Sequence, residues 1–264
     1  MTIDRPLGVV LAGGLARRMG GGDKARLRIG GRTILERVLA RLKPQCARLI
    51  LNANGDPARF ADTGIAVVSD TVPDFAGPLA GILAALEWAA AQAPGITDVA
   101  SVPGDCPFLP DDLVARLLAA RVAQRTRLAC ARSGERRHPV VGLWPVDLRG
   151  DLRKALVEEG VRKIEAFTAR HGVAVADWPT SPFDPFFNVN RPEDAAEAER
   201  IAAQIAATLR DRGVTAPQAT FASEAGMTVL RVAVERWANE VDGRDLSDIM
   251  RESVAELRSV TIRR

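Results

Sequence analysis

The chain has 264 residues, 47% of them hydrophobic and 26% charged, and its formal net charge is +3. This balance is typical of a globular protein with one large domain or two small ones, and it excludes disordered, collagen-like and fibrous chains. The small net charge argues against a nucleic-acid partner. No apolar run reaches the ~18–20 residues of a membrane span, and the first residues do not resemble a signal peptide. We therefore expect a cytoplasmic protein with no membrane partner.

The three cysteines are Cys46, Cys106 and Cys130. They are too few for a disulfide framework, and none of them is spaced as a CxxC pair. We therefore expect a reducing compartment and no cysteine zinc site.

Short apolar segments typical of buried strands alternate with helical patterns along the first part of the chain. Thr33 and Glu36 have the spacing of a capping box at the start of a helix. Two or three helices, interrupted by a segment rich in proline and phenylalanine, are expected within 151–212. The alternation predicts an α/β fold with a mostly parallel sheet and helices on both faces. The expected strands are 7–11, 49–51, 67–68, 99–102, 128–131 and 139–143, and the expected helices include 79–91 and 113–122.

Polar residues follow four of these expected strands. The first strand leads into a glycine-rich loop over 12–24, and the next three lead to Asn52, Asp70 and Asp105. Ligands of parallel α/β sheets bind at the carboxyl ends of the strands. We therefore expect these four chain segments to line one binding crevice.

The glycine-rich loop has the sequence LAGGLARRMGGGDK over 11–24. Glycines allow backbone N–H groups to surround an anion, and Arg18 and Lys24 add cationic donors for phosphate oxygens. The loop is neither a Walker A motif nor GxGxxG. The alternative is a plain surface loop after a strand.

Asp105 suits Mg²⁺, which takes one or two carboxylates and leaves its other positions to water and phosphate. The alternative for Asp105 and for Asp70 is an aspartate that stabilises a turn. Asn52 either binds a ribose or base, or simply ends a strand.

Two further groups of polar residues have competing interpretations. Cys106 and His138 could form a nucleophile and base, but a buried cysteine more often serves packing. Asn188 and Asn190 alternate as in a strand, which points both amides the same way. These amides either bind a polar ligand or make hydrogen bonds within a loop.

The chain resembles the molybdenum cofactor guanylyltransferases, a branch of the nucleotidyltransferases with a Rossmann-like fold. The matching segments occur in the family's order. They are LAGGLARRMGGGDKA at 11–25, LNAN at 51–54, VVSD at 67–70, GPLAG at 77–81, VPGDCPFLP at 102–110, RRHPVVGLW at 136–144 and FFNVNRPED at 186–194.

The resemblance implies transfer of GMP from GTP to the phosphate of molybdenum-molybdopterin, with Mg²⁺ as cofactor and pyrophosphate as leaving group. It implies that Asp105 binds the metal and acts in catalysis with Arg18 and Lys24, and that Asn188 and Asn190 lie near the pterin. The nucleotide-binding residues that it implies are Leu11, Ala12, Gly13, Gly14, Lys24, Asn52, Asp70 and Asp105.

The resemblance also bears on partners and on rival functions. Beyond its substrates, the candidate partners are other proteins of the cofactor pathway and apo-molybdoenzymes, and the expected state is a monomer or weak homo-oligomer. The nearest rival is a cytidylyltransferase or another nucleotidyltransferase of the same fold. A rival of another class is a non-catalytic nucleotide sensor, against which Lys24 and Asp105 argue because a sensor needs no metal-positioning carboxylate.

The last part of the chain differs in character from residues 1–212, which we assign to the nucleotidyltransferase domain. Apolar residues recur at helical spacing in 227–241 and 245–260, and opposite charges balance. We predict that 213–264 forms a helical extension that packs on the domain or on a second copy. Its removal should lower stability or change molecular mass while guanylyl transfer persists, as light scattering and an activity assay would show. Loss of turnover in a folded truncation of native mass would contradict this.

Overall fold

The computed structural model describes residues 5–13, 26–29, 32–72, 77–181 and 183–189, and in addition 194, 196–198, 200, 203 and 252. The chain divides into two compact units, 1–195 and 196–264. The fold described below is that of the first unit. The predicted boundary at residue 212 and all of 213–264 except residue 252 fall outside the described residues, so the boundary and the predicted helices stay predictions.

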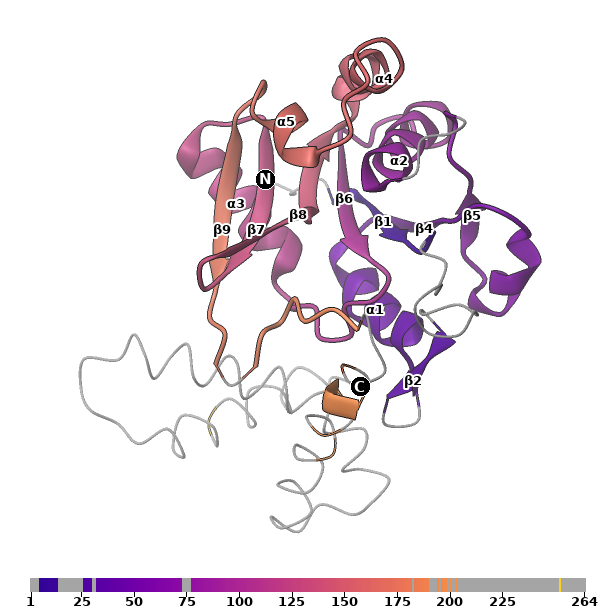
Figure 1. Ribbon diagram of the computed structural model, residues 1–264, viewed down its shortest axis with the longest axis vertical. Coiled ribbons are helices and arrows are strands. Elements are labelled where there is room, and N and C mark those ends of the chain that lie inside the picture. Colours follow the sequence, from indigo (N-terminus) through magenta and orange to yellow (C-terminus); the bar gives the residue numbers. More distant parts are fainter. Residues whose placement is uncertain are drawn as a thin grey trace. The chain divides into compact units, whose positions relative to one another are not determined.

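The first unit is built on a mixed sheet that has seven strands within the described residues (Figure 1). The strand order is β5-β4-β1-β6-β8-β7-β9, and β1 pairs in parallel with both β4 and β6. The strands are β1 (Leu7–Leu11), β4 (Arg48–Asn52), β5 (Ala66–Val68), β6 (Asp98–Pro103), β7 (Leu128–Ser133), β8 (Arg136–Pro145) and β9 (Val173–Trp178).

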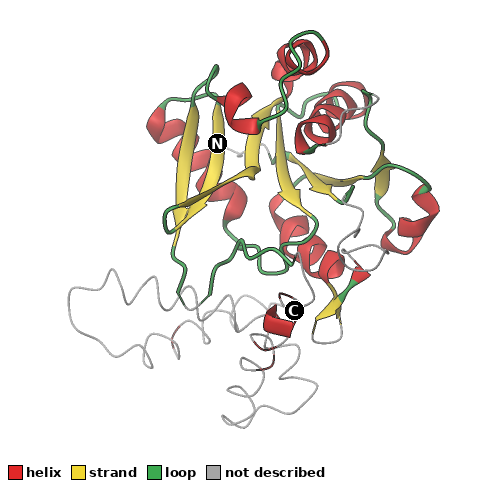
Figure 2. Ribbon diagram, in the orientation of Figure 1, coloured by secondary structure: helices red, strands yellow, loops and turns green. Residues whose placement is uncertain are grey.

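Helices cover both faces of this sheet, as predicted (Figure 2). The helix α2 packs on β1, β4, β5 and β6 and is joined there by α4, whereas α1 packs on β1 and α3 packs on β7, β8 and β9. The α-helices are α1 (Ile34–Leu42), α2 (Pro78–Gln92), α3 (Leu113–Gln124), α4 (Arg149–Val157) and α5 (Ile164–Thr168). The short elements are the hairpin β2 (Arg28–Ile29) and β3 (Arg32–Thr33), and the 3₁₀ helices η3 (Lys43–Gln45), η4 (Pro57–Thr63) and η5 (Val146–Leu148).

The predicted capping box at the start of α1 is confirmed. The Oγ1 of Thr33 accepts a hydrogen bond from the backbone N–H of Glu36 at 3.1 Å, and the Glu36 carboxylate accepts one from the Thr33 N–H at 2.6 Å. These two bonds satisfy N–H groups that have no partner within the helix. The bond from Thr33 also lowers the pKa of the Glu36 carboxyl group.

The region after β8 departs from the sequence-based expectation. Two or three helices interrupted by a segment rich in proline and phenylalanine were expected within 151–212, but residues 173–178 form the edge strand β9, parallel to β7. Its inward residues Ala174, Ala176 and Trp178 are buried, and they alternate with more exposed ones, which is the period of a strand with one covered face. The sequence VAVADW carries this alternation, but with two alanines it is a weak signal.

The strand β8 runs antiparallel to β6 and β7, so the sheet is mostly rather than wholly parallel. Only Gly134 and Glu135 connect β7 to β8, and so short a connection can join only antiparallel strands. The φ of Gly134 is +54°, which glycine adopts without strain.

A hydrophobic core lies between the sheet and the α2 side. Fully buried residues of β1, β4 and β6 pack there on α2, α4 and α5. These strands are continuous apolar runs because both of their faces are covered. Among the described residues, none of the helices has the length and apolar character needed to cross a bilayer.

Candidate active site

Three parallel strands bring their carboxyl ends to one edge of the sheet, as the sequence predicts. Leu11 lies opposite Asn52 of β4 and Pro103 of β6. Two backbone hydrogen bonds extend the pairing beyond the strands, from the N–H of Ala12 to the carbonyl of Asn52 (2.8 Å) and from the N–H of Gly104 to the carbonyl of Leu11 (3.0 Å). The segments that carry Ala12, Asn52 and Asp105 are therefore held side by side.

Asn52 and Asp70 form a hydrogen-bonded pair at this edge. The amide of Asn52 donates to Oδ1 of Asp70 at 2.9 Å and to the carbonyl of Val68 at 3.1 Å. Asn54 holds the other carboxylate oxygen, because its amide donates to Oδ2 of Asp70 at 2.8 Å while its Oδ1 accepts from the Asp70 N–H at 2.8 Å. Both oxygens of Asp70 therefore accept hydrogen bonds from neutral amides, which fix the orientation of the carboxylate.

Asn54 was not among the predicted site residues. Asn52 and Asn54 are two positions apart, the spacing that singled out Asn188 and Asn190 in the sequence. The same argument applied at the end of β4 would have found Asn54.

Gly81 of α2 lies directly against Asn52, whose side chain is only 5% exposed. A Cβ at Gly81 would stand 2.1 Å from Oδ1 of Asn52 and 2.9 Å from Cδ2 of Leu11. Only glycine permits this close approach of helix and strand end. Gly13 is different, because a Cβ there would meet nothing of the described chain within 4 Å.

Replacing Gly81 with alanine is expected to lower the free energy of unfolding by ~1–3 kcal/mol, because overpacking at the buried Asn52 outweighs the usual gain of ~0.5–1 kcal/mol for alanine in a helix. Denaturant unfolding would measure the change. Gly150→Ala in α4 is the matched control, since a Cβ there meets nothing described within 4 Å, and it should keep or raise stability. Equal changes in the two variants would contradict the prediction.

Asp105 follows β6 and meets the segment 183–189, which is far away in the sequence. The amide of Asn188 donates to Oδ1 of Asp105 at 2.8 Å, and the N–H of Val189 donates to the Asp105 carbonyl at 3.0 Å. The residues 183–189 form no regular strand, so the strand-like alternation predicted for Asn188 and Asn190 is not borne out at Asn188. The prediction that Asn188 lies near the crevice does not depend on this alternation.

Four predicted site residues lie outside the described residues: Gly14, Arg18, Lys24 and Asn190. Their assignments stay predictions.

Cys106 and His138 do not form a nucleophile and base. The thiol of Cys106 is fully buried and faces the carbonyl of Phe186, whereas the imidazole of His138 pairs with Ser133 at 2.7 Å. Burial raises the pKa of the Cys106 thiol well above its usual range and lowers the pKa of His138, so both are neutral near pH 7. The packing interpretation of the sequence is confirmed.

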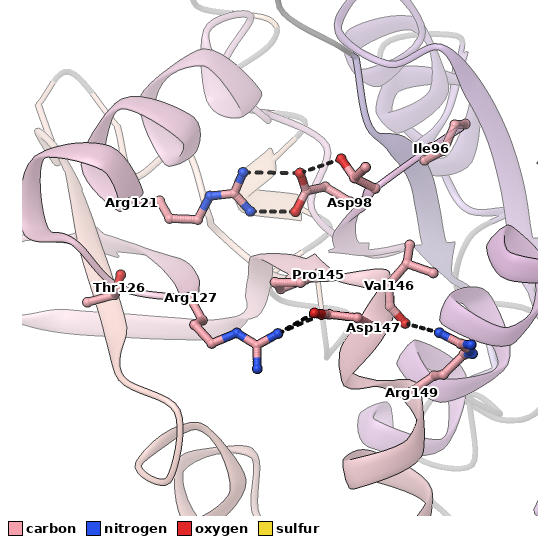
Figure 3. Close-up of a pocket in the computed structure, with 10 residues that line it drawn as sticks. Ile96, Asp98, Arg121, Thr126, Arg127, Pro145, Val146, Asp147 and Arg149 are labelled. Carbon is pink, nitrogen blue, oxygen red and sulfur yellow. Dashed lines mark hydrogen bonds and ion pairs between the residues drawn. The ribbon is translucent and has the colours of Figure 1, made fainter. Parts of the chain in front are cut away.

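A cavity of about 500 Å³ lies at the opposite edge of the sheet, next to the start of β6 and the end of β8 (Figure 3). Two of its arginines make ion pairs: Arg121 binds both oxygens of Asp98 through two nitrogens, and Arg127 binds both oxygens of Asp147 through Nη2. Arg149 donates to the carbonyl of Val146 at 3.2 Å. Because two of the three cations are neutralised, the cavity has little charge to offer an anionic ligand.

The α/β fold with polar residues at the strand ends is that expected of a nucleotidyltransferase, and comparison with known proteins shows the family. The model of the MobA-like NTP transferase domain matches residues 8–174. A molybdenum cofactor guanylyltransferase of Nitrobacter hamburgensis is 62% identical over 205 residues, which cover 77% of this chain and 98% of that protein. One from a Bradyrhizobium species is 63% identical over 196 residues, covering 74% and 92%. The chain belongs to the family of molybdenum cofactor guanylyltransferases.

Solved structures show the same fold at lower identity. Molybdopterin-guanine dinucleotide biosynthesis protein A from Archaeoglobus fulgidus superposes with a TM-score of 0.58 at 22% identity, over 75% of this chain and 99% of that one. A Mycobacterium tuberculosis protein in complex with manganese gives 0.55 at 21% identity, over 74% and 98%. At this identity the likeness concerns the fold alone.

Proposed function

We propose that this protein transfers GMP from GTP to the terminal phosphate of molybdenum-molybdopterin and releases pyrophosphate, with Mg²⁺ as cofactor. Family membership supports the reaction. The observation that carries the proposal for this chain is the hydrogen bond of Asn188 to Asp105, at the same end of the parallel strands as the Asn52–Asp70 pair. This bond joins the amide of Asn188, expected on the side of the pterin acceptor, to the carboxylate of Asp105, which suits a metal.

A metal at Asp105 fits the chemistry of the donors. No group of three or more histidine, cysteine, aspartate or glutamate side chains suited to a metal occurs within the described ranges. Mg²⁺ needs no such cage, since one or two carboxylates and the substrate phosphates complete its shell. When bound, Mg²⁺ neutralises phosphate charge and helps the leaving pyrophosphate depart.

The chain's own residues have to bind and orient two polyanions. The acceptor phosphate is already an anion at neutral pH, so no general base is required, which agrees with the neutral, buried Cys106 and His138. We assign nucleotide binding to the strand-end segment Leu11–Gly14 and to Asn52 and Asp70. Arg18 and Lys24 are assigned to the phosphates and Asn188 and Asn190 to the pterin. Positioning and fixed charges supply the rate enhancement of such a site.

The test is incubation of the purified protein with labelled GTP, Mg²⁺ and molybdenum-loaded molybdopterin. We expect the guanine dinucleotide and pyrophosphate in equal amounts, loss of both with a chelator, and recovery on adding Mg²⁺. GTP that binds but is never converted would favour the nucleotide sensor instead. The same preparation, measured by light scattering, tests the proposed monomer or weak homo-oligomer.

A further inference from the structure

Phe186 lies at the centre of a buried cluster beside the site. Its side chain has no exposed surface, and its ring contacts two others, Trp178 at 5.2 Å in an edge-on arrangement and His138 at 4.8 Å between ring centroids. Its backbone is also fixed, because its N–H donates to Asp184 at 2.9 Å and its carbonyl faces the thiol of Cys106 at 3.7 Å.

The support under this ring comes from three adjacent strands. His138 of β8 lies opposite Ala131 of β7, and two residues further along β7 Ser133 lies opposite Trp178 of β9. Positions two apart on a strand share a face, so the two rings flank Phe186 from one side of the sheet. The Ser133 hydroxyl and Nε2 of His138 pair at 2.7 Å, and the two residues are 2% and 6% exposed.

Phe186 connects this rigid support to the site. Within four residues the chain touches the Asp105–Cys106 turn at three points: the Phe186 carbonyl, the Asn188 amide and the Val189 N–H. The last two hold Asp105 by its side chain and its backbone. No helix or strand fixes residues 183–189, and Phe186 ties this segment to the sheet through its ring contacts with His138 of β8 and Trp178 of β9.

We propose that Phe186 is a positioning residue that holds Asn188 against Asp105, and that the Ser133–His138 pair is the buried support that fixes Phe186. The catalytic part of this proposal rests on the proposed function, which assigns Asn188 to the acceptor side of the site and Asp105 to the metal. A misplacement of even 1 Å between reacting groups lowers rates by up to about 10²-fold.

The test compares Phe186→Leu with Phe167→Leu. Phe167 is a matched control because it is also fully buried and also contacts a tryptophan and a histidine, Trp144 and His171, yet it belongs to α5. Hydrogen exchange of the Val189 amide reports the position of the segment without any activity. We expect Phe186→Leu to speed that exchange at least ~10-fold and to lower kcat ~10-fold, with KM for GTP within ~2-fold. Phe167→Leu should change only the melting temperature.

Unchanged protection of Val189 in Phe186→Leu, or equal loss in both variants, would overturn the proposal. If Phe186→Leu does not fold, Ser133→Ala replaces it and Ser101→Ala is the control. Ser101 is also a fully buried serine, and its hydroxyl accepts a hydrogen bond from the ring nitrogen of Trp144. Ser133→Ala should then speed Val189 exchange ~3-fold and Ser101→Ala should not, and the reverse pattern would overturn the proposal. Absence of guanylyl transfer by the unaltered protein would refute the proposed function and leave the exchange result standing.

Discussion

Replacing Asp105 with asparagine is expected to lower kcat by about 10²–10³-fold while the protein stays folded. The change removes the negative charge of the carboxylate that we assign to Mg²⁺ binding. Losing a group that stabilises developing charge in the transition state costs several kcal/mol. The fold should tolerate it, because the asparagine carbonyl can still accept the hydrogen bond of Asn188 and the backbone bond from Val189 is unaffected.

Asp98→Asn is the matched control for this experiment. Asp98 is the first residue of β6, whose last residue, Pro103, stands two positions before Asp105, so the two carboxylates flank the same strand at opposite edges of the sheet. Asp98 is paired with Arg121, so its loss should lower the melting temperature with turnover nearly unchanged. Rates are measured at saturating GTP over a Mg²⁺ titration, with circular dichroism as the check on folding. Near-normal turnover of Asp105→Asn would remove Asp105 from its assigned role.

The parallel half of the sheet was predictable because short stretches of sequence each carry the signal for one of its strands. Leu7–Leu11 is an apolar strand and Asp98–Pro103 a largely apolar one, both have covered faces, and each leads into a polar or glycine-rich stretch of sequence. The helix start at Thr33 was predictable for the same reason, since both partners of its capping box lie within four residues.

The antiparallel half was harder because its evidence is weak or non-local. β9 consists largely of small residues, so the apolar alternation in Val173–Trp178 is faint next to the helical patterns around it. The hydrogen bond between Asp105 and Asn188 joins residues 83 positions apart, and neither strand periodicity nor turn chemistry encodes such a pair. Only the resemblance to a family brought the two residues into one predicted site.

Gly81 and Phe186 lie in segments that match the family, but their roles depend on packing that those motifs do not describe. Gly81 matters because Asn52 fills the space beside it, and that is visible only once α2 is docked on the sheet. Phe186 looks like an ordinary core residue in the sequence, and it is one by burial. Phe186 is distinguished by its position, which lies between the Ser133–His138 pair on one side and the turn at Asp105 on the other.

GTP should be preferred over CTP by at least ~10²-fold in kcat/KM, which corresponds to ~2.7 kcal/mol of transition-state binding. A site with buried polar groups matched to one base leaves them unpaired with another, and such groups are costly to leave unpaired. The groups at the end of β4 cannot easily rearrange. Asn52 is held by Val68 and Asp70 and confined by Gly81, and Asp70 is held at both oxygens.

Competition between labelled GTP and CTP in one reaction measures this ratio directly, because it compares kcat/KM values under identical conditions. ATP is the informative third nucleotide. A site that selected only for the size of a purine would use ATP nearly as well as GTP. We expect ATP to be rejected along with CTP, because the fixed amides and carboxylate of Asn52, Asn54 and Asp70 would discriminate by hydrogen bonding. Equal use of CTP would refute guanylyl transfer as the activity, while the fold and the arrangement of Asp105 and Asn188 would stand.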